Sequence, residues 1–165
     1  MNKEHKYSIA INWTGNLGTG TSGYQTYNRS HTIVIAGKEK IFCSSDPAFH
    51  GDNSKHNPEE LFLASLSSCH MLWYLHLCAD AGIIVIDYKD NATGILEEDT
   101  ISGGRFISVT LNPIVEVYES SMIEKAKAFH DDANKQCFIA NSCNFPVKHN
   151  PLCSAKAESQ KKINK

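Results

Sequence analysis

The sequence lacks several features that would place a protein directly in a known class. Its 165 residues include six cysteines but no Cys-x-x-Cys pair, so the closely spaced ligands of a structural zinc site are missing. Neither sign of charge is in large excess, because the net charge is −2. This balance does not favour a nucleic-acid or an anionic-membrane partner. No apolar signal segment follows Met1, so we expect a soluble, cytoplasmic protein.

A long uninterrupted apolar run is missing as well. The longest apolar stretch, residues 61–81, contains three serines, two histidines and an aspartate. It is therefore too polar for a membrane span and predicts a buried core helix. A chain of this length buries enough surface to fold without disulfides. We expect one domain over residues 1–153, followed by a polar, lysine-rich tail at 154–165.

The strongest local signal is a helix start in the middle of the chain. Asn57 is a good capping residue, Pro58 suits the first helical position, and Glu60 completes a capping box. The helix is predicted to run to Ala81, before Gly82. Its apolar residues cover nearly the whole circumference, so protein must surround it. Because one sheet covers only one side, we expect a second copy of the chain to cover part of the rest, in an obligate homodimer.

The rest of the chain predicts strands and one further helix. A second helix is expected to be capped by Ser120 or Ser121 and to end near Cys137. Alternation of apolar and polar residues predicts strands at 7–13, 24–36, 40–44, 83–94 and 106–117, with a short edge strand at 145–147. The resulting order, in which strands are followed by the long helix, further strands and the second helix, is typical of an α+β domain with an antiparallel sheet.

Two cysteines stand on these helices. Cys69 lies in the middle of the long helix and Cys137 at the end of the second. A buried thiol and a second thiol at a helix end are what a reactive and resolving pair requires. The alternative is that each fills space in the core. A Cys/His metal site is disfavoured by the spacing of the cysteines, so no metal is expected.

The segments around these cysteines resemble one family. Residues 57–64, followed by Ser68-Cys69-His70, resemble the signature of the OsmC/Ohr superfamily, the osmotically inducible and organic hydroperoxide resistance proteins. Residues 133–141 resemble that family's second cysteine segment, and the resemblance extends from about residue 7 to 146. It implies an OsmC-like fold, in which an antiparallel sheet packs on a long buried central helix and a second helix. It also implies a cytoplasmic, cofactor-free, intertwined homodimer that reduces organic hydroperoxides.

The resemblance implies roles for particular residues. Cys69 would be the peroxidatic thiol and Cys137 the resolving thiol, with an external dithiol as reductant. Burial alone raises a thiol's pKa, so a reactive thiolate needs a cation nearby. The chain has two arginines. Arg29 lies on an apolar strand face and would suit a site shared with Glu59, whereas Arg105 is expected at a strand end near solvent.

Two further features leave alternatives open. His50 stands in the loop where one branch of the family has its arginine, so it is another candidate for the cation. Four aromatic residues could line an apolar pocket for an alkyl or lipid hydroperoxide, or could simply be core. They are Phe49, Phe62, Trp73 and Phe138. The alternative function is a non-catalytic binding protein that holds a small apolar or thiol-bearing molecule in the same dimer cavity.

Helix geometry limits how Glu59 and Cys69 can share a site. Ten residues along one helix separate them by about 15 Å, with an offset of about 80° around the axis. Either the helix begins well after Glu59, or Glu59 acts on the other subunit. The cap at Asn57 favours an early start. We therefore expect composite sites in which Glu59 faces Cys69 of the partner subunit.

Overall fold

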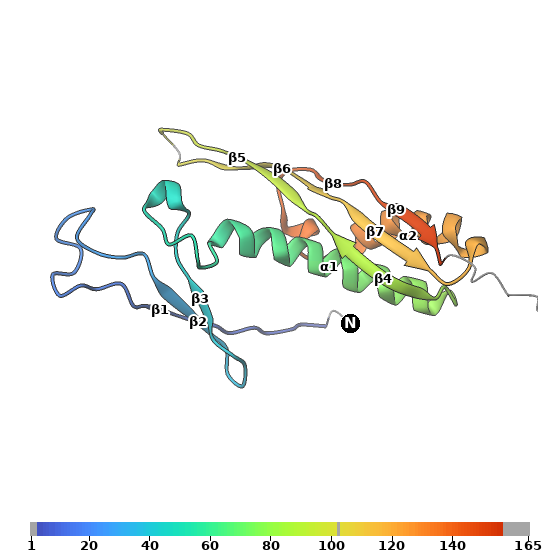
Figure 1. Cartoon of the computed structure of the whole chain (residues 1–165), viewed down its shortest axis with the longest axis horizontal. Helices are drawn as coiled ribbons and strands as arrows, with labels where there is room; N and C mark the ends of the chain where they lie inside the picture. The colour runs from blue at the N-terminus through green and yellow to red at the C-terminus, as the bar shows by residue number, and fades with distance from the viewer. Residues whose placement is uncertain (1–2, 102, 157–165) are drawn as a thin grey trace, which may run out of the picture. The chain divides into compact units, whose positions relative to one another are not determined.

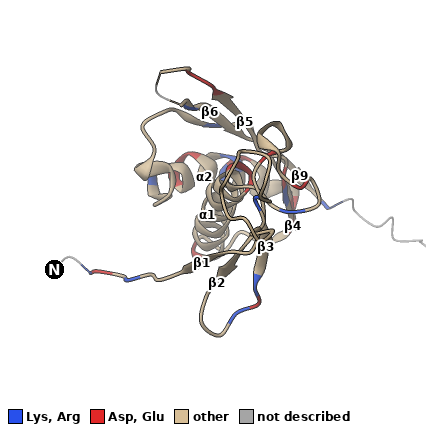
Figure 2. Ribbon diagram, turned by 90° about the vertical axis from the view of Figure 1, so that its left-hand side faces the viewer, with Lys and Arg blue, Asp and Glu red and all other residues tan. Residues whose placement is uncertain are grey.

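The structure, a computed structural model, describes residues 3–101 and 103–156. The chain divides into two compact units, Met1–Phe62 and Leu63–Lys165, and each is described by itself. Strands and two long helices follow one another along the chain (Figure 1), which confirms the predicted α+β class. Acidic and basic residues are interspersed along the ribbon (Figure 2), in keeping with the net charge of −2.

The first unit contains a three-stranded antiparallel sheet with the order β1-β2-β3. Its strands are β1 (Ala10–Trp13), β2 (His31–Val34) and β3 (Ile41–Cys43), followed by a 3-10 turn at Pro47–Phe49. The prediction of a strand from residue 24 was wrong for its first seven residues. The chain closes a loop there instead, because Asn28 donates to the Gly15 carbonyl at 2.9 Å and the Trp13 indole donates to the Asn28 carbonyl at 2.8 Å.

Helix α1 (Pro58–Asp80) starts where the capping signal predicts. The Asn57 side chain accepts from the Glu60 amide at 2.8 Å, and the Asn57 amide donates to the Glu60 carboxylate at 3.2 Å, which is a complete capping box. At the other end Gly82 takes a left-handed φ of 72°, and the Ile83 amide bonds the Cys78 carbonyl at 2.8 Å. Both predicted ends are therefore confirmed to within one residue.

Only one stripe of α1 is buried within the chain. The stripe consists of Leu66, His70, Tyr74 and Cys78, each one turn after the last. Elsewhere the helix is half-buried or exposed, with Leu72 63% exposed, so the expectation that protein surrounds it is not met by one chain. By length and composition alone α1 could cross a membrane, a test that the core helices of soluble proteins also pass.

The second unit contains two three-stranded sheets, ordered β4-β7-β9 and β5-β6-β8. The β4–β7 and β5–β6 pairs are antiparallel, whereas β7–β9 and β6–β8 are parallel, so the sheets are mixed rather than purely antiparallel. The strands are β4 (Val85–Asp90), β5 (Thr93–Glu97), β6 (Arg105–Leu111), β7 (Pro113–Val117), β8 (Val147–His149) and β9 (Leu152–Ala155).

Each of the two long strands predicted in this unit is broken in two. One break falls between β4 and β5 and the other at Asn112. At these breaks, hydrogen bonds that involve side chains take the place of the backbone hydrogen bonds between strands. Asp90 accepts from the Asn112 amide at 2.7 Å, and the Asn112 side chain donates to the Asn91 carbonyl at 2.8 Å. Strand β9 continues to Ala155, two residues into the predicted tail, and residues 157–165 of that tail lie outside the described residues.

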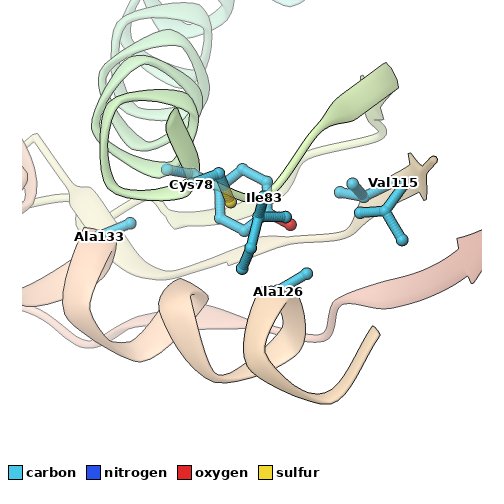
Figure 3. Close-up of a cluster of buried hydrophobic side chains, with 7 residues drawn as sticks. Cys78, Ile83, Val115, Ala126 and Ala133 are labelled. Atoms are coloured by element: carbon cyan, nitrogen blue, oxygen red, sulfur yellow. The ribbon is translucent and has the colours of Figure 1, made fainter. Parts of the chain in front are cut away.

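Helix α2 (Ile123–Gln136) ends beside Cys137, as predicted. Its start differs from the prediction, because Ser120–Met122 forms a 3-10 turn and no side chain caps the helix. A third 3-10 turn, Ala140–Ser142, follows α2. The core of this unit lies between α1, α2 and the β4-β7-β9 sheet (Figure 3). Its buried members are Tyr74, Cys78, Ile83, Val115, Val117, Ala126 and Ala133.

Candidate functional site

The two helices of the second unit bring Cys69 and Cys137 together. Cys69 lies half-buried in the middle of α1, and Cys137, in extended conformation directly after α2, is 1% exposed. The two thiols are in hydrogen-bonding contact although 68 residues of sequence separate them. The predicted pair is thus placed side by side, with both thiols free.

The surroundings of Cys137 keep it protonated. Burial raises the pKa of its thiol to about 11, and the hydrogen bond with Cys69 acts in the same direction. The Ala140 amide, which donates to the Cys137 sulfur at 3.4 Å, lowers the pKa by a smaller amount. At neutral pH Cys137 is therefore a thiol whose S–H is available to donate to the sulfur of Cys69.

Two of the four predicted pocket residues lie together beside the thiols. Trp73, one turn after Cys69, packs edge-to-face on Phe138, which directly follows Cys137, with ring centroids 5.6 Å apart. Phe138 is 66% exposed, so this pair presents an apolar surface next to the cysteines. The other two predicted members, Phe49 and Phe62, belong to the first unit.

Arg29 is engaged within the first unit. Its guanidinium donates to the carbonyls of Tyr27 at 2.7 Å and Tyr24 at 2.6 Å. It also lies 4.3 Å and 4.4 Å from the centroids of these two rings, a cation–π arrangement. The exposed His50 packs edge-on to the same Tyr24 ring at 5.2 Å. Two candidate cations therefore meet at one tyrosine.

Glu59 lies in the first turn of α1, and the oxygen Oε2 of its carboxylate is buried without a hydrogen-bond partner among the described residues. Because α1 already begins at Pro58, Glu59 and Cys69 of one chain are about 15 Å apart along the helix axis. A late helix start, one of the two ways of joining them, is therefore excluded. A buried carboxylate oxygen without a partner is costly and points to a missing donor.

Arg105 is not part of this arrangement. It is exposed at the first residue of β6, opposite Glu97 in the β5–β6 register. This position beside the loop that joins β5 and β6 agrees with the expected strand-end location near solvent.

Sequence reasoning missed a group of histidines next to the cysteine pair. His70 Nε2 lies 3.0 Å from His130 Nδ1, and both side chains are fully buried. Burial lowers the pKa of His70 to about 4 and that of His130 to about 3, so both imidazoles are neutral at physiological pH. His149 packs against both rings and bonds Asp131 at 2.9 Å. One feature of the sequence could have predicted this group. His70 lies on the buried stripe of α1, where a polar side chain requires a hydrogen-bond partner.

Within residues 3–101 and 103–156, no group of three His, Cys, Asp or Glu side chains is arranged to hold a metal ion. The stacked rings of His70 and His130, 5.3 Å apart, bond each other instead of converging on one point.

Comparisons with known proteins agree on one family. Residues 51–151 match the family model for OsmC-like proteins. The structure is similar to an OsmC-like protein of unknown function from Vibrio cholerae, with 31% identity, a TM-score of 0.82, and coverage of 90% of this chain and 100% of that one. No curated protein sequence matches the chain.

Two more distant structures share the fold. An organic hydroperoxide resistance protein OsmC from Legionella pneumophila is 18% identical, with a TM-score of 0.65 and coverage of 92% of this chain and 99% of that one. An organic hydroperoxide resistance protein from Elizabethkingia anophelis is 17% identical, with a TM-score of 0.64 and coverage of 93% and 100%.

Proposed function

Since the chain belongs to the OsmC-like protein family and has its fold, we propose that it is a thiol-dependent peroxidase that reduces organic hydroperoxides through Cys69 and Cys137. The observation that carries this proposal is the contact between the two thiols, one of which is kept protonated. A family whose members include organic hydroperoxide resistance proteins supports the choice of substrate.

The reaction uses the two thiols in turn. The Cys69 thiolate attacks the O–O bond, becomes a sulfenic acid, and releases the alcohol after one proton is taken up. Cys137 then condenses with the sulfenic acid, which forms the disulfide and releases water. An external dithiol reduces the disulfide and restores both thiols. The overall change is ROOH plus a dithiol to ROH, water and a disulfide.

The raised pKa of Cys137 suits the resolving role. A resolving thiol that ionised beside Cys69 would place two negative charges together and oppose formation of the Cys69 thiolate. Burial and the hydrogen bond with Cys69 instead raise the pKa of Cys137, so this thiol keeps its proton until it is needed for the second step. When Cys69 becomes a sulfenic acid, it no longer carries the charge that holds the Cys137 proton.

We propose that the cation is supplied by Arg29 and that the site is completed in a homodimer. Glu59 has a buried carboxylate oxygen without a described partner, which a guanidinium would satisfy. In the single chain Glu59 is about 15 Å from Cys69 along α1. A second copy would bring Glu59 to Cys69 of the partner subunit, so that each dimer has two composite sites.

The exposed apolar side of α1 supports the dimer. Leu72 is 63% exposed, and an open hollow of about 500 Å³ near the end of the helix is lined by apolar residues such as Leu75 and Ile84. Sedimentation at micromolar concentration is expected to give the dimer mass for the wild-type chain and a monomer mass for Leu72→Glu. A wild-type monomer would refute the composite site.

The test of the activity is consumption of cumene hydroperoxide in the presence of an excess of a dithiol. Cys69→Ser is expected to reduce the rate to the uncatalysed level. Cys137→Ser is expected to allow a single turnover that stops at the sulfenic acid. Cys143→Ser, which removes another half-buried thiol, is the matched control and should retain the wild-type rate. A Cys69→Ser protein as active as the wild type would refute the peroxidase.

The cis and trans arrangements can be separated by mixing variants. A heterodimer of a Glu59→Ala chain and a Cys69→Ser chain places both defects in one site if Glu59 acts across the interface, so the other site remains intact. About half of the wild-type activity is then expected. Activity no higher than that of either variant homodimer would show that Glu59 acts on its own chain.

Binding without catalysis is a second candidate, favoured by the exposed ring of Phe138, which contacts the half-buried Trp73 beside the thiols. A small apolar or thiol-bearing molecule would pack on these rings. Calorimetric titration of such a thiol into the Cys69→Ser protein tests it, because binding that survives while no hydroperoxide is consumed by the wild type would support this function. The six free cysteines and the need for an external dithiol fit a reducing compartment, and we propose a cytoplasmic location.

A further inference from the structure

A hydrogen bond between two buried histidines joins the helices that carry the proposed cysteine pair. His70 Nε2 lies 3.0 Å from His130 Nδ1, and the two ring planes differ by 8°. His70 directly follows Cys69 in α1, and His130 lies in α2, seven residues before Cys137. The bond therefore spans the same two segments that bring the thiols together.

Helix geometry relates His130 to the cysteine that follows it. Seven residues of an α-helix make nearly two complete turns, so Cys137, at the end of α2, follows His130 on the same face, about 10 Å further along the axis. The face of α2 that His130 turns toward α1 is thus the face from which Cys137 approaches Cys69. A rotation or slide of α2 that breaks the bond between the histidines also displaces Cys137.

Other contacts hold His130 in place. Its ring stacks on Tyr74 of α1 with centroids 3.9 Å apart, and its Nε2 lies 4.0 Å from the Cys153 sulfur of β9. The next residue of α2, Asp131, bonds His149 of β8 at 2.9 Å. This part of α2 is therefore fixed by three neighbouring elements, α1, β8 and β9.

The bond satisfies polar atoms that burial would otherwise leave unpaired. Both side chains are fully buried, and His70 Nδ1 has no hydrogen-bond partner among the described residues, so His130 supplies the only hydrogen bond of the His70 ring there. A neutral imidazole has one N–H and one bare nitrogen, so the bond forms only when one ring donates and the other accepts. Removing either ring leaves the other with an unpaired polar atom in the core, which favours a shift of the helices that admits water.

A second contact between the two segments is less strict. Trp73, one turn after Cys69, packs edge-to-face on Phe138 with ring centroids 5.6 Å apart. A contact between apolar rings tolerates small shifts, whereas a hydrogen bond weakens steeply when its length or angle changes. The histidines therefore set the distance between α1 and α2 more narrowly than the aromatic rings do.

We propose that the His70–His130 hydrogen bond positions the two thiols, so that both histidines are positioning residues for closure of the Cys69–Cys137 disulfide. The inference deepens the proposed function and rests on its cysteine pair, but it concerns the disulfide step and not the reaction with hydroperoxide. Each histidine acts through the placement of the helix that carries it.

Amide side chains test which nitrogen makes the contact. The amide of Gln reaches the position of a histidine Nε2, the shorter amide of Asn reaches that of Nδ1, and both can donate or accept. Because His70 uses Nε2 and His130 uses Nδ1, His70→Gln and His130→Asn are expected to keep the hydrogen bond. His70→Asn and His130→Gln are expected to lose it. Since the same two side chains rank in opposite order at the two positions, a general loss of packing does not produce this pattern.

The readout is the equilibrium between dithiol and disulfide in a glutathione buffer at pH 7.5. Two protein thiols are oxidised as one oxidised glutathione is reduced to two molecules of glutathione, so the equilibrium constant reports how well the thiols are placed for each other. After acid quenching, alkylation and trypsin digestion, mass spectrometry measures the cross-link of residues 56–89 to residues 136–148. Fragmentation of this product assigns the link to Cys69 and Cys137.

The four variants are expected to fall into two groups. His70→Asn and His130→Gln should lower the equilibrium constant about tenfold, which corresponds to about 30 mV for this two-electron couple. His70→Gln and His130→Asn should stay within about threefold of the wild type. If a variant at one position does not fold, the ranking of Asn and Gln at the other position decides.

Val117→Ala is the matched control, because it shortens a fully buried side chain of the core cluster that belongs to neither helix. It should lower the urea midpoint of unfolding and leave the equilibrium constant unchanged. Equal constants for all four histidine variants, or a fall in Val117→Ala as large as that in His130→Gln, would overturn the proposal.

Consumption of cumene hydroperoxide separates this proposal from the proposed function. A wild-type chain that closes the disulfide in glutathione but consumes no hydroperoxide refutes the peroxidase, while the ranking of the variants still decides the positioning role. An active peroxidase whose four variants share one constant keeps the proposed function and refutes the positioning role. A wild-type chain that forms no Cys69–Cys137 disulfide in this buffer overturns both.

Discussion

The buried His70–His130 pair predicts that the protein loses stability well before its carboxylates are protonated. In the unfolded chain a histidine has a pKa of about 6.5. In the folded protein burial lowers the pKa to about 4 for His70 and to about 3 for His130. His149 lowers both pKa values further, whereas Asp90 raises that of His70 and Asp131 raises that of His130, each by less than burial lowers it.

The sign follows from proton binding. Because the folded pKa values are depressed, the folded state keeps both imidazoles neutral while the unfolded state binds protons below about pH 6.5. The stability contributed by the pair is therefore complete above pH 6.5 and decreases as pH falls toward 4. Two protons bound only by the unfolded state give a slope approaching about 2.7 kcal/mol per pH unit. Between pH 7 and pH 5 the free energy of unfolding should drop by roughly 3–4 kcal/mol.

Urea unfolding at pH 7, 6 and 5, at one protein concentration, measures this change. The His130→Gln protein should lose about half of the slope, because one of the two titrating groups is gone. His76→Gln removes a histidine whose side chain is 58% exposed and should leave the slope unchanged. A wild-type protein equally stable at pH 7 and pH 5, or a His130→Gln protein with the full slope, would refute the reasoning.

Three substitutions test the packing and capping. Asn57→Ala removes the acceptor of the Glu60 amide and should lower the free energy of unfolding by about 1 kcal/mol, as measured by urea unfolding at pH 7. Gly94→Ala should destabilise by about 1–3 kcal/mol in the same assay, because a Cβ there would lie 2.9 Å from the Leu63 side chain. Leu66→Ala should destabilise by about 2–5 kcal/mol because its side chain is fully buried, and a change below 1 kcal/mol would contradict the buried stripe of α1.

Local features of the sequence were sufficient to predict the two helices and the position of the candidate cysteines on them. The capping box of Asn57 and Glu60 and the left-handed Gly82 involve residues within four positions of the helix ends, so the ends of α1 are visible in the sequence. The placement of Cys69 within α1 and of Cys137 at the end of α2 follows from the same local signals.

The breaks in the strands and the pairing of the strands could not be predicted from neighbouring residues in the sequence. The alternating pattern runs through Asn112 without interruption, and only the bond from its amide to Asp90, 22 residues away in sequence, shows why the strand ends there. Strand β9 was missed for a related reason. Its parallel pairing with β7 depends on residues about 38 positions apart, and nothing in the four residues Leu152–Ala155 alone distinguishes a strand from an extended tail.

The contacts that decide the chemistry come from tertiary structure in every case. Sequence spacing does not reveal that His70 and His130, 60 residues apart, share a hydrogen bond, or that the ring of Tyr74 stacks on that of His130 with centroids 3.9 Å apart. The sequence by itself determined which side chains each helix carries, both ends of α1 and the end of α2, because capping and periodicity act over a few residues. Only the tertiary structure decided which thiol meets which, because that depends on how α1, α2 and β9 pack around one core.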